Sequence, residues 1–238
     1  MIVAIIFAVL TFLVFLYFEL KRQFLVAFFF KTLASFSFIL ILVSTLIYGN
    51  WVNSNWLGYM STEHVGLAYL FLLGLICGFA GDLILALRPF FDKEKHTQII
   101  FAGTIAFAIG HVFYLFGLLK LMDFSWWAIV FSVIATSLIF IIGIFVMKLN
   151  FKKLLIPSII YSSLLFLMVG MTIFGFNDFD RQPFAIVIMV SAILFGLSDI
   201  VLSQIYFGDK ETNLLKAINL SLYYLAQIGI ASSILFFI

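Results

Sequence analysis

The amino-acid sequence predicts an all-α integral membrane protein with eight transmembrane helices. Hydrophobic residues make up 65% of the chain and charged residues only 10%, whereas a soluble domain carries about 25% charged residues. The apolar residues form long continuous runs rather than the short alternating segments of a membrane β-barrel. The 238 residues leave no room for a second, soluble domain, so we expect residues 1–238 to form a single transmembrane domain.

Eight apolar runs approach or exceed the length of about 20 residues that a spanning helix needs. In chain order they cover residues 2–18, 32–49, 65–87, 98–119, 125–147, 154–176, 184–206 and 213–237. Polar joints separate them, in order at Glu19 to Arg22, Asn53 to Asn55, Arg88-Pro89, Lys120, Lys148 to Lys153, Arg181 to Pro183 and Gly208 to Lys210. The first run lacks a basic leader and a small-residue cleavage site, so we interpret it as a retained span.

The basic residues predict the orientation of the helices. Eleven of them fall on the side that follows the first span: Lys21, Arg22, Lys31, Arg88, Lys93, Lys95, Lys148, Lys152, Lys153, Lys210 and Lys216. Only Lys120 and Arg181 fall on the other side. Because cytoplasmic loops carry an excess of Lys and Arg, we expect the first side to be cytoplasmic and both termini to lie outside. Residues 21–31 are interpreted as a short amphipathic segment on the inner leaflet.

A short repeat indicates an internal duplication. The sequences Gly81-Asp82-Leu83-Ile84-Leu85 and Ser198-Asp199-Ile200-Val201-Leu202 lie 117 residues apart, about half of the chain. Both place an aspartate on a helix that runs inward. Two parallel four-helix halves, related by an axis along the membrane normal, would produce this pattern; the alternative is the coincidence of two short motifs.

Glycines predict where helices pack closely. Gly74 and Gly78 form a small-xxx-small pair, and Gly103, Gly110 and Gly117 recur every seven residues. Small residues at such spacing allow the backbones of two membrane helices to approach each other.

Two of the eleven acidic residues fall inside the predicted spans, Asp82 and Asp199. The other nine are expected to be solvated: Glu19, Glu63, Asp92, Glu94, Asp123, Asp178, Asp180, Asp209 and Glu211. A carboxylate in the hydrocarbon core costs about 2.5–3.5 kcal/mol on insertion scales. We expect no buried Lys or Arg beside either aspartate, so two such acids at matching positions indicate a function. The plain alternative is a pair of acids that only hold helices together through hydrogen bonds.

Further polar residues are expected near the two aspartates. A rise of about 1.5 Å per residue places Asp82 roughly 9 Å and Asp199 roughly 13 Å inside the cytoplasmic boundary. Spans 3, 4, 7 and 8 carry most of the polar groups, and spans 1, 2, 5 and 6 carry few. The candidate binding residues on the fourth and eighth spans are His111, Tyr114, Asn219, Tyr223 and Gln227. Together these positions predict a polar cavity inside an apolar shell.

Five short motifs occur in a fixed order along the chain. They are Gly81-Asp82-x-x-Leu85, Phe101-x-Gly103, Gly110-His111-x-x-Tyr114, Leu197-Ser198-Asp199-x-x-Leu202 and Tyr223-Tyr224-x-Ala226-Gln227. In this order, and with eight spans, the sequence resembles the YhhN-like lysoplasmalogenase family over about residues 60–237. The resemblance implies a membrane hydrolase that cleaves the vinyl ether bond of a lysophospholipid substrate, a lysoplasmalogen, to a fatty aldehyde and a glycerophospho-ethanolamine or -choline. It implies Asp82 and Asp199 as the catalytic pair, and the expected location is the bacterial inner membrane.

This chemistry suits two carboxyl groups. Hydrolysis of a vinyl ether begins with a proton transfer to carbon, and water then adds to the oxocarbenium ion. Two carboxyls that share one proton supply an acid and a carboxylate together, with their individual roles left open. The five candidate binding residues would orient water or bind substrate oxygens, and Arg88 or Lys93 would lie near the phosphate. No phosphate-binding loop or metal-ligand motif is present in the sequence, so no metal or other cofactor is expected.

The charge balance argues against nucleic acid as a partner, because the net charge is only +2 and no dense basic tract is present.

Three other membrane functions are alternatives to the hydrolase. An intramembrane aspartyl protease would also use two membrane aspartates, but its Tyr-Asp and Gly-x-Gly-Asp motifs are not intact here. A proton-coupled transporter would favour broken helices, whereas Pro157 lies in the first turn of its span, where proline is tolerated. A non-catalytic lipid-binding bundle is the third alternative.

Overall fold

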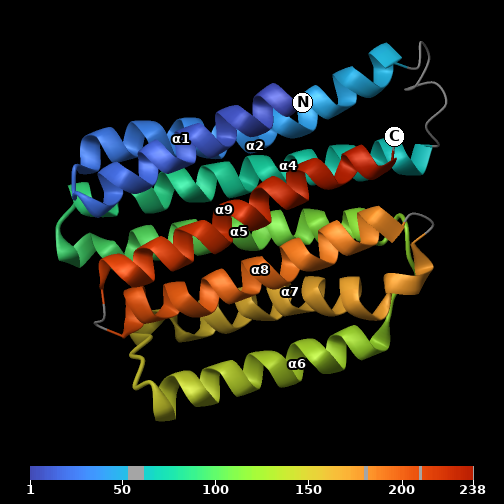
Figure 1. Cartoon of the computed structure of the whole chain (residues 1–238). Helices are drawn as coiled ribbons and strands as arrows, with labels where there is room; N and C mark the ends of the chain where they lie inside the picture. The colour runs from blue at the N-terminus through green and yellow to red at the C-terminus, as the bar shows by residue number, and fades with distance from the viewer. Residues whose placement is uncertain (53–61, 180–181, 209–210, 238) are drawn as a thin grey trace.

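Long apolar helices that run side by side make up most of the molecule (Figure 1). The computed structural model describes residues 1–52, 62–179, 182–208 and 211–237. The long helices within these ranges are α1 (Ile2–Leu20), α2 (Phe24–Val52), α4 (Thr62–Ala86), α5 (Lys93–Leu118), α6 (Trp126–Ile141), α7 (Leu155–Phe174), α8 (Gln182–Phe207) and α9 (Asn213–Ser233). In the described part of the chain, eight helices are long and apolar enough to cross a membrane, which confirms the predicted number of spans.

Short helical turns of other types adjoin several of the long helices. A π-helical turn, η2 (Ile142–Val146), continues α6, and the 3₁₀ turns are η1 (Arg88–Phe90), η3 (Lys152–Leu154), η4 (Phe176–Asp178) and η5 (Ile234–Phe237). No strand occurs in the described ranges. The predictions made for Asn53 to Asn55, Asp180, Arg181, Asp209 and Lys210 lie outside the described residues.

The start of α2 corrects the sequence interpretation. Residues 21–31 do not form a separate segment on the membrane surface, because α2 begins at Phe24 and continues without a break to Val52. The chain turns between α1 and α2 at Arg22, whose φ is 57°. Phe28 to Phe30 precede Lys31, and Leu33 and Ala34 follow shortly after it, so the helix extends through it into the bundle.

The contacts between helices have the same pattern in the two halves of the chain. In the first half α1 packs on α2, α2 on α4 and α4 on α5, and in the second α6 packs on α7, α7 on α8 and α8 on α9. The halves meet through α5 on α7 and through α2 on α9, which are equivalent positions in the two series. These contacts fit the predicted duplication, and the axis that relates the halves stays a prediction.

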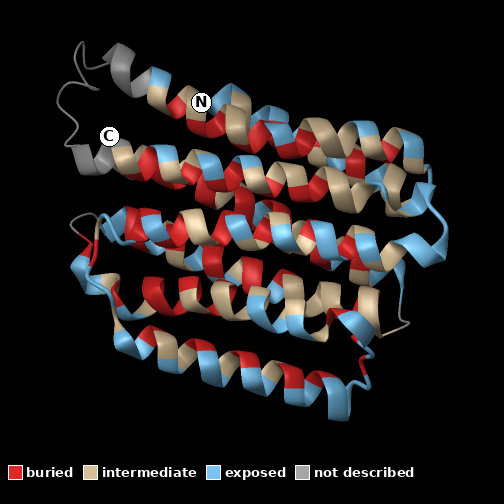
Figure 2. Cartoon of the chain, turned by 180° about the vertical axis from the view of Figure 1, so that it is seen from behind, coloured by how far each residue is buried: buried red, intermediate tan, exposed pale blue. Residues whose placement is uncertain are grey.

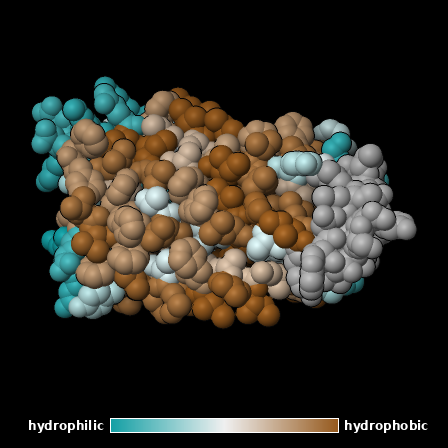
Figure 3. Space-filling view, turned by 90° about the horizontal axis from the view of Figure 1, so that it is seen from above, coloured by the Kyte–Doolittle hydropathy of each residue, from teal (hydrophilic) through white to brown (hydrophobic). Residues whose placement is uncertain are grey.

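One end of the bundle collects most of the charge. The loops α1–α2, α4–α5, α6–α7 and α8–α9 lie together at this end, and both chain termini lie toward the other end (Figure 1). The hydrophilic surface gathers at the same end, while the flank of the bundle is apolar (Figure 3). We call it the basic end, after the lysines and arginines of these loops. Its assignment to the cytoplasm stays a prediction.

Buried residues face the spaces between the helices, and exposed ones face outward (Figure 2). Many exposed residues are large and apolar, such as Val3, Phe145 and Trp126, as expected for a surface that meets lipid. A β-carbon on Gly110 would lie 3.0 Å from the carbonyl oxygen of Gly74, so α4 and α5 approach backbone to backbone. The prediction that these glycines allow close packing is confirmed, and the contact sets the position of α4, which carries Asp82.

Candidate active site

Both interior aspartates line one cavity of about 160 Å³. Asp82 reaches it from α4 and Asp199 from α8. The remaining wall is mostly apolar and comes from α2, α5, α6, α7, α8 and α9 and from the segment between α6 and α7. Its larger apolar side chains include Phe107, Phe140, Phe151, Leu165, Phe166 and Phe195. The fold therefore brings two acids from distant parts of the sequence into a chamber that is otherwise suited to a hydrocarbon chain.

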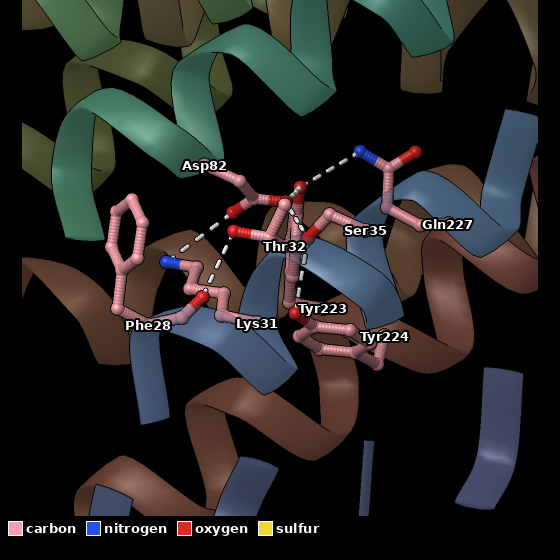
Figure 4. A network of polar contacts seen from close by, with 8 residues as sticks. All are labelled: Phe28, Lys31, Thr32, Ser35, Asp82, Tyr223, Tyr224 and Gln227. Carbon is pink, nitrogen blue, oxygen red and sulfur yellow. Dashed lines mark hydrogen bonds and ion pairs between the residues drawn. The ribbon is translucent and has the colours of Figure 1, made fainter. Parts of the chain in front are cut away.

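Asp82 lies at the centre of a polar network (Figure 4). Its side chain is buried, and its Oδ2 accepts hydrogen bonds from Ser35 Oγ at 2.7 Å and from Tyr223 Oη at 2.7 Å. The ammonium of Lys31 lies 3.5 Å from Oδ1. The sequence expectation of no buried cation beside either aspartate is therefore wrong, because α2 carries Lys31 into the bundle. One positive charge and two hydroxyl donors therefore surround this carboxyl group.

A second layer of contacts holds the donors of Asp82 in place. Gln227 Nε2 donates to Tyr223 Oη at 3.1 Å, so the tyrosine oxygen is held between the amide and the carboxylate. Ser35 Oγ lies 3.1 Å from Tyr224 Oη, whose ring stacks on Phe12. These contacts join α2 and α9 around the tip of the Asp82 side chain (Figure 4), and the ring contact of Tyr224 with Phe12 adds α1 behind them.

Asp199 has different surroundings. Its Oδ2 accepts a short hydrogen bond from Tyr161 Oη, and Ser198 Oγ lies 3.5 Å from Oδ1. Among the residues that the structure describes, no Lys or Arg lies within ion-pair distance of it. Tyr161 lines the same cavity as the two acids. The pair is thus asymmetric: one acid has a cation beside it and the other does not.

The five candidate binding residues fall into two groups. Tyr223 and Asn219 line the cavity, and Asn219 Nδ2 donates to the carbonyl oxygen of Ser198 at 2.7 Å, which ties α9 to α8 beside Asp199. Gln227 does not line the cavity but supports Tyr223 from behind.

His111 and Tyr114 are buried outside the cavity wall. His111 Nδ1 lies 2.8 Å from the carbonyl oxygen of Phe107, and its ring centroid lies 5.5 Å from that of Tyr161. Within the described residues, His111 Nε2 and Tyr114 Oη have no hydrogen-bond partner. Both side chains thus lie on α5 one and two turns beyond Phe107, which lines the cavity, and not at the two acids.

Several cavity residues were missed by the sequence analysis. The expectation that spans 2 and 6 carry few polar groups is wrong, because α2 supplies Lys31 and Ser35 and α7 supplies Ser158, Tyr161 and Ser162. Residues three or four positions apart share one face of a helix. That spacing was a usable signal, since both sets form a polar stripe on an otherwise apolar span.

The acidic residues at the basic end also differ from expectation. Glu19 was expected to be solvated, but it is half-buried and its Oε1 lies 3.4 Å from Lys216 Nζ. Glu211 is exposed as expected, and it pairs with the same lysine at 2.6 Å.

Of the two cations expected near a phosphate, Arg88 lines a cavity and Lys93 does not. In the described ranges no three His, Cys, Asp or Glu side chains are grouped as a metal site would need.

The fold and the cavity define a polytopic helical membrane protein with an acidic pair inside the bundle. The chain belongs to the YhhN family, since the model of that family matches residues 26–234. The match includes nearly all of α2, which the motif resemblance over about residues 60–237 did not reach. No curated protein and no solved structure matches the chain in the other two comparisons. Membership of this family suggests a membrane enzyme and is consistent with hydrolase activity.

Proposed function

We propose that this protein hydrolyses the vinyl ether bond of lysoplasmalogens between Asp82 and Asp199. The products would be a fatty aldehyde and a glycerophospho-ethanolamine or -choline. The observation that carries the proposal is that two carboxyl groups with unequal surroundings line one mostly apolar cavity. Family membership supports a membrane enzyme, and the apolar wall suits the alkenyl chain of such a substrate.

The unequal surroundings assign the two roles. Lys31 and two hydroxyl donors stabilise the charge of Asp82, so this residue acts as the carboxylate. Asp199 has no cation beside it in the described part of the chain, and burial without a countercharge favours its neutral form. Asp199 is therefore the proton donor. Tyr161, which donates a hydrogen bond to Oδ2 of Asp199, leaves Oδ1 to carry the proton.

The two carboxyl groups are sufficient for every proton transfer in the catalytic cycle. Asp199 gives its proton to the vinyl carbon beta to the ether oxygen, which forms an oxocarbenium ion that the Asp82 carboxylate stabilises. Water then adds to the cation and gives a proton to Asp82. The resulting hemiacetal collapses as its hydroxyl proton returns to Asp199, and the departing glycerol oxygen takes the proton from Asp82. Both acids end in their starting states.

The test is aldehyde release by purified protein in detergent with an alkenyl lysophosphoethanolamine. Asp82→Asn and Asp199→Asn are each expected to lower the rate about 100-fold or more, the lower range of general acid–base catalysis. Asp123→Asn is the matched control, because this exposed aspartate lies outside the cavity, and it should match wild type. All variants should show the same elution profile in gel filtration.

A substrate control tests the chemistry separately. The saturated alkyl ether of the same lysolipid cannot accept a proton on carbon, so it should not be cleaved. Aldehyde release that survives both aspartate substitutions would overturn the mechanism. A folded wild-type protein that releases no aldehyde would overturn the proposed function itself.

A further inference from the structure

A second cavity of about 90 Å³ adjoins the first at the basic end of the bundle. It lies among α1, α2, α4, α8 and α9. The residues that line both cavities are Lys31, Leu85, Leu202, Tyr206, Asn219 and Leu220. Because the two cavities share these side chains as walls, they meet at Lys31 and Asn219.

Three cations from different elements line this second cavity. They are Lys31 on α2, Arg88 on η1 and Lys216 on α9, with side-chain exposures of 13%, 18% and 10% respectively. Arg88 lies over the ring of Tyr206, at 4.5 Å from its centroid, which fixes the plane of the guanidinium. Cations withdrawn from solvent need anionic partners. Glu19 is the acid that the described wall contributes, 3.4 Å from Lys216, so the three cations outnumber it and the balance of charge favours a further anion.

Glu211 shows where such an anion can sit. Its carboxylate bridges two of the cations, at 2.6 Å from Lys216 Nζ and 3.7 Å from Arg88 Nη2. Yet Glu211 is exposed, with 44% of its side chain accessible, and it comes from the α8–α9 loop rather than from the cavity wall. The pair of cations is thus occupied from the solvent side by a group that can move away.

We propose that the second cavity binds the phosphate of the lysophospholipid between Arg88 and Lys216, in place of the Glu211 carboxylate. This inference rests on the proposed function and adds the subsite that selects a phosphorylated substrate. A planar guanidinium and an ammonium suit a phosphate diester. Three glycerol carbons separate that phosphate from the vinyl ether, which places the reacting bond at the junction of the cavities, where Lys31 pairs with Asp82.

The polarity of the two cavities matches the polarity of the substrate in this orientation. The phosphate lies at the basic end of the bundle, and the alkenyl chain lies among the aromatic side chains of the first cavity. The reverse orientation would place the phosphate in the more apolar first cavity, away from Arg88 and Lys216.

The test compares two substrates, an alkenyl lysophosphoethanolamine and a 1-alkenylglycerol that lacks the phosphate. Arg88→Gln is expected to lower the ratio of kcat/KM for the first substrate over the second at least tenfold, about 1.4 kcal/mol. Lys95→Gln, which removes an exposed cation at the same end outside both cavities, should leave the ratio within about twofold of wild type. An unchanged ratio in Arg88→Gln would overturn the subsite.

A binding measurement separates this inference from the proposed function. Fluorescent 1-alkyl lysophosphoethanolamine and 1-alkylglycerol cannot be hydrolysed by this mechanism, so their dissociation constants do not depend on activity. Arg88→Gln should weaken binding of the phosphate-bearing ligand alone, even if wild type released no aldehyde. Glu211→Gln should tighten it severalfold, because the competing carboxylate is gone. Unchanged or weaker binding in Glu211→Gln would overturn the displacement of Glu211.

Discussion

At the scale of single residues, Lys31 decides how the two acids differ. Its ammonium lies 3.5 Å from Asp82 Oδ1, and both side chains are largely withdrawn from solvent. Removing one partner of a buried ion pair leaves the other charge uncompensated and typically costs about 3–5 kcal/mol, whereas removing both costs much less. The pair therefore acts as a unit in stability as well as in the proposed chemistry.

This coupling predicts an unusual order of stabilities. Lys31→Met should lower the thermal midpoint in detergent markedly, and the double variant Lys31→Met with Asp82→Asn should be more stable than the single variant. The reason is that the asparagine side chain in the double variant carries no charge that needs a cation. A thermal unfolding series on the four proteins of this double-mutant cycle measures the coupling. Strictly additive losses would contradict it.

Tyr161 is a second single residue with a predicted role, which is to orient the Asp199 carboxyl group. Tyr161→Phe removes the hydroxyl that donates to Asp199 but keeps the ring that packs beside His111. We expect aldehyde release to fall about 10- to 100-fold with little change in the thermal midpoint, because Asp199 loses its orientation and not its environment. Tyr69→Phe is the control, since Tyr69 is 62% exposed. Equal rates for the two variants would exclude a positioning role for Tyr161.

At the scale of elements, the contact between α4 and α5 positions Asp82. Gly110→Ala would place its β-carbon 3.0 Å from the carbonyl oxygen of Gly74, and a backbone atom cannot swing aside. We expect a loss of about 1–3 kcal/mol, as in other overpacked contacts, seen as a lower thermal midpoint. Gly66→Ala meets only Lys120 Cε at 4.0 Å and should be neutral or slightly stabilising. Similar midpoints for the two variants would contradict the close contact.

The α8–α9 loop contributes a contact that depends on pH. The hydrogen bond from Lys216 lowers the pKa of Glu211 below its ordinary value of 4.5. A lowered pKa means that the ion pair stabilises the fold fully above pH 4.5 and that this contribution is lost as the pH falls through the folded-state value. The difference in thermal midpoint between wild type and Glu211→Gln should thus be constant from pH 7 to about 5 and shrink below 4.5. A difference that grows on acidification would contradict this assignment.

At the scale of the whole molecule, the charge distribution predicts the orientation in the membrane. The basic end should face the cytoplasm. In a Cys77→Ala background, a membrane-impermeant maleimide should label Asp123→Cys in intact cells, and it should label Lys95→Cys only after permeabilisation. Both positions are exposed in loops or at a helix end, so access by the reagent is the variable tested. The opposite labelling pattern would invert the proposed topology.

The sequence by itself determined the number of spans, the end at which charge gathers and the identity of the two interior acids. Each of these properties depends on residues that are close together in the sequence. The length and hydropathy of a run decide whether it can span a membrane, and a carboxylate inside such a run needs only its position in the run to be recognised. The glycine spacing on α5 could also be interpreted from the sequence alone, because the absence of a side chain allows any neighbouring helix to approach closely.

Only the tertiary structure decided which polar residues meet the acids. Ser35 and Asp82 are 47 residues apart in the chain, and Tyr161 and Asp199 are 38 apart, so no local pattern pairs them. His111 and Tyr114 are as polar as Tyr223 and share a face of α5 with Thr104 and Phe107, which line the cavity, yet they lie one and two turns beyond Phe107 and outside the cavity wall. How far the cavity extends along each helix is set by packing with the neighbouring helices over many contacts. In a chain with so little polar contrast, that extent is what separates a cavity residue from one buried beyond it.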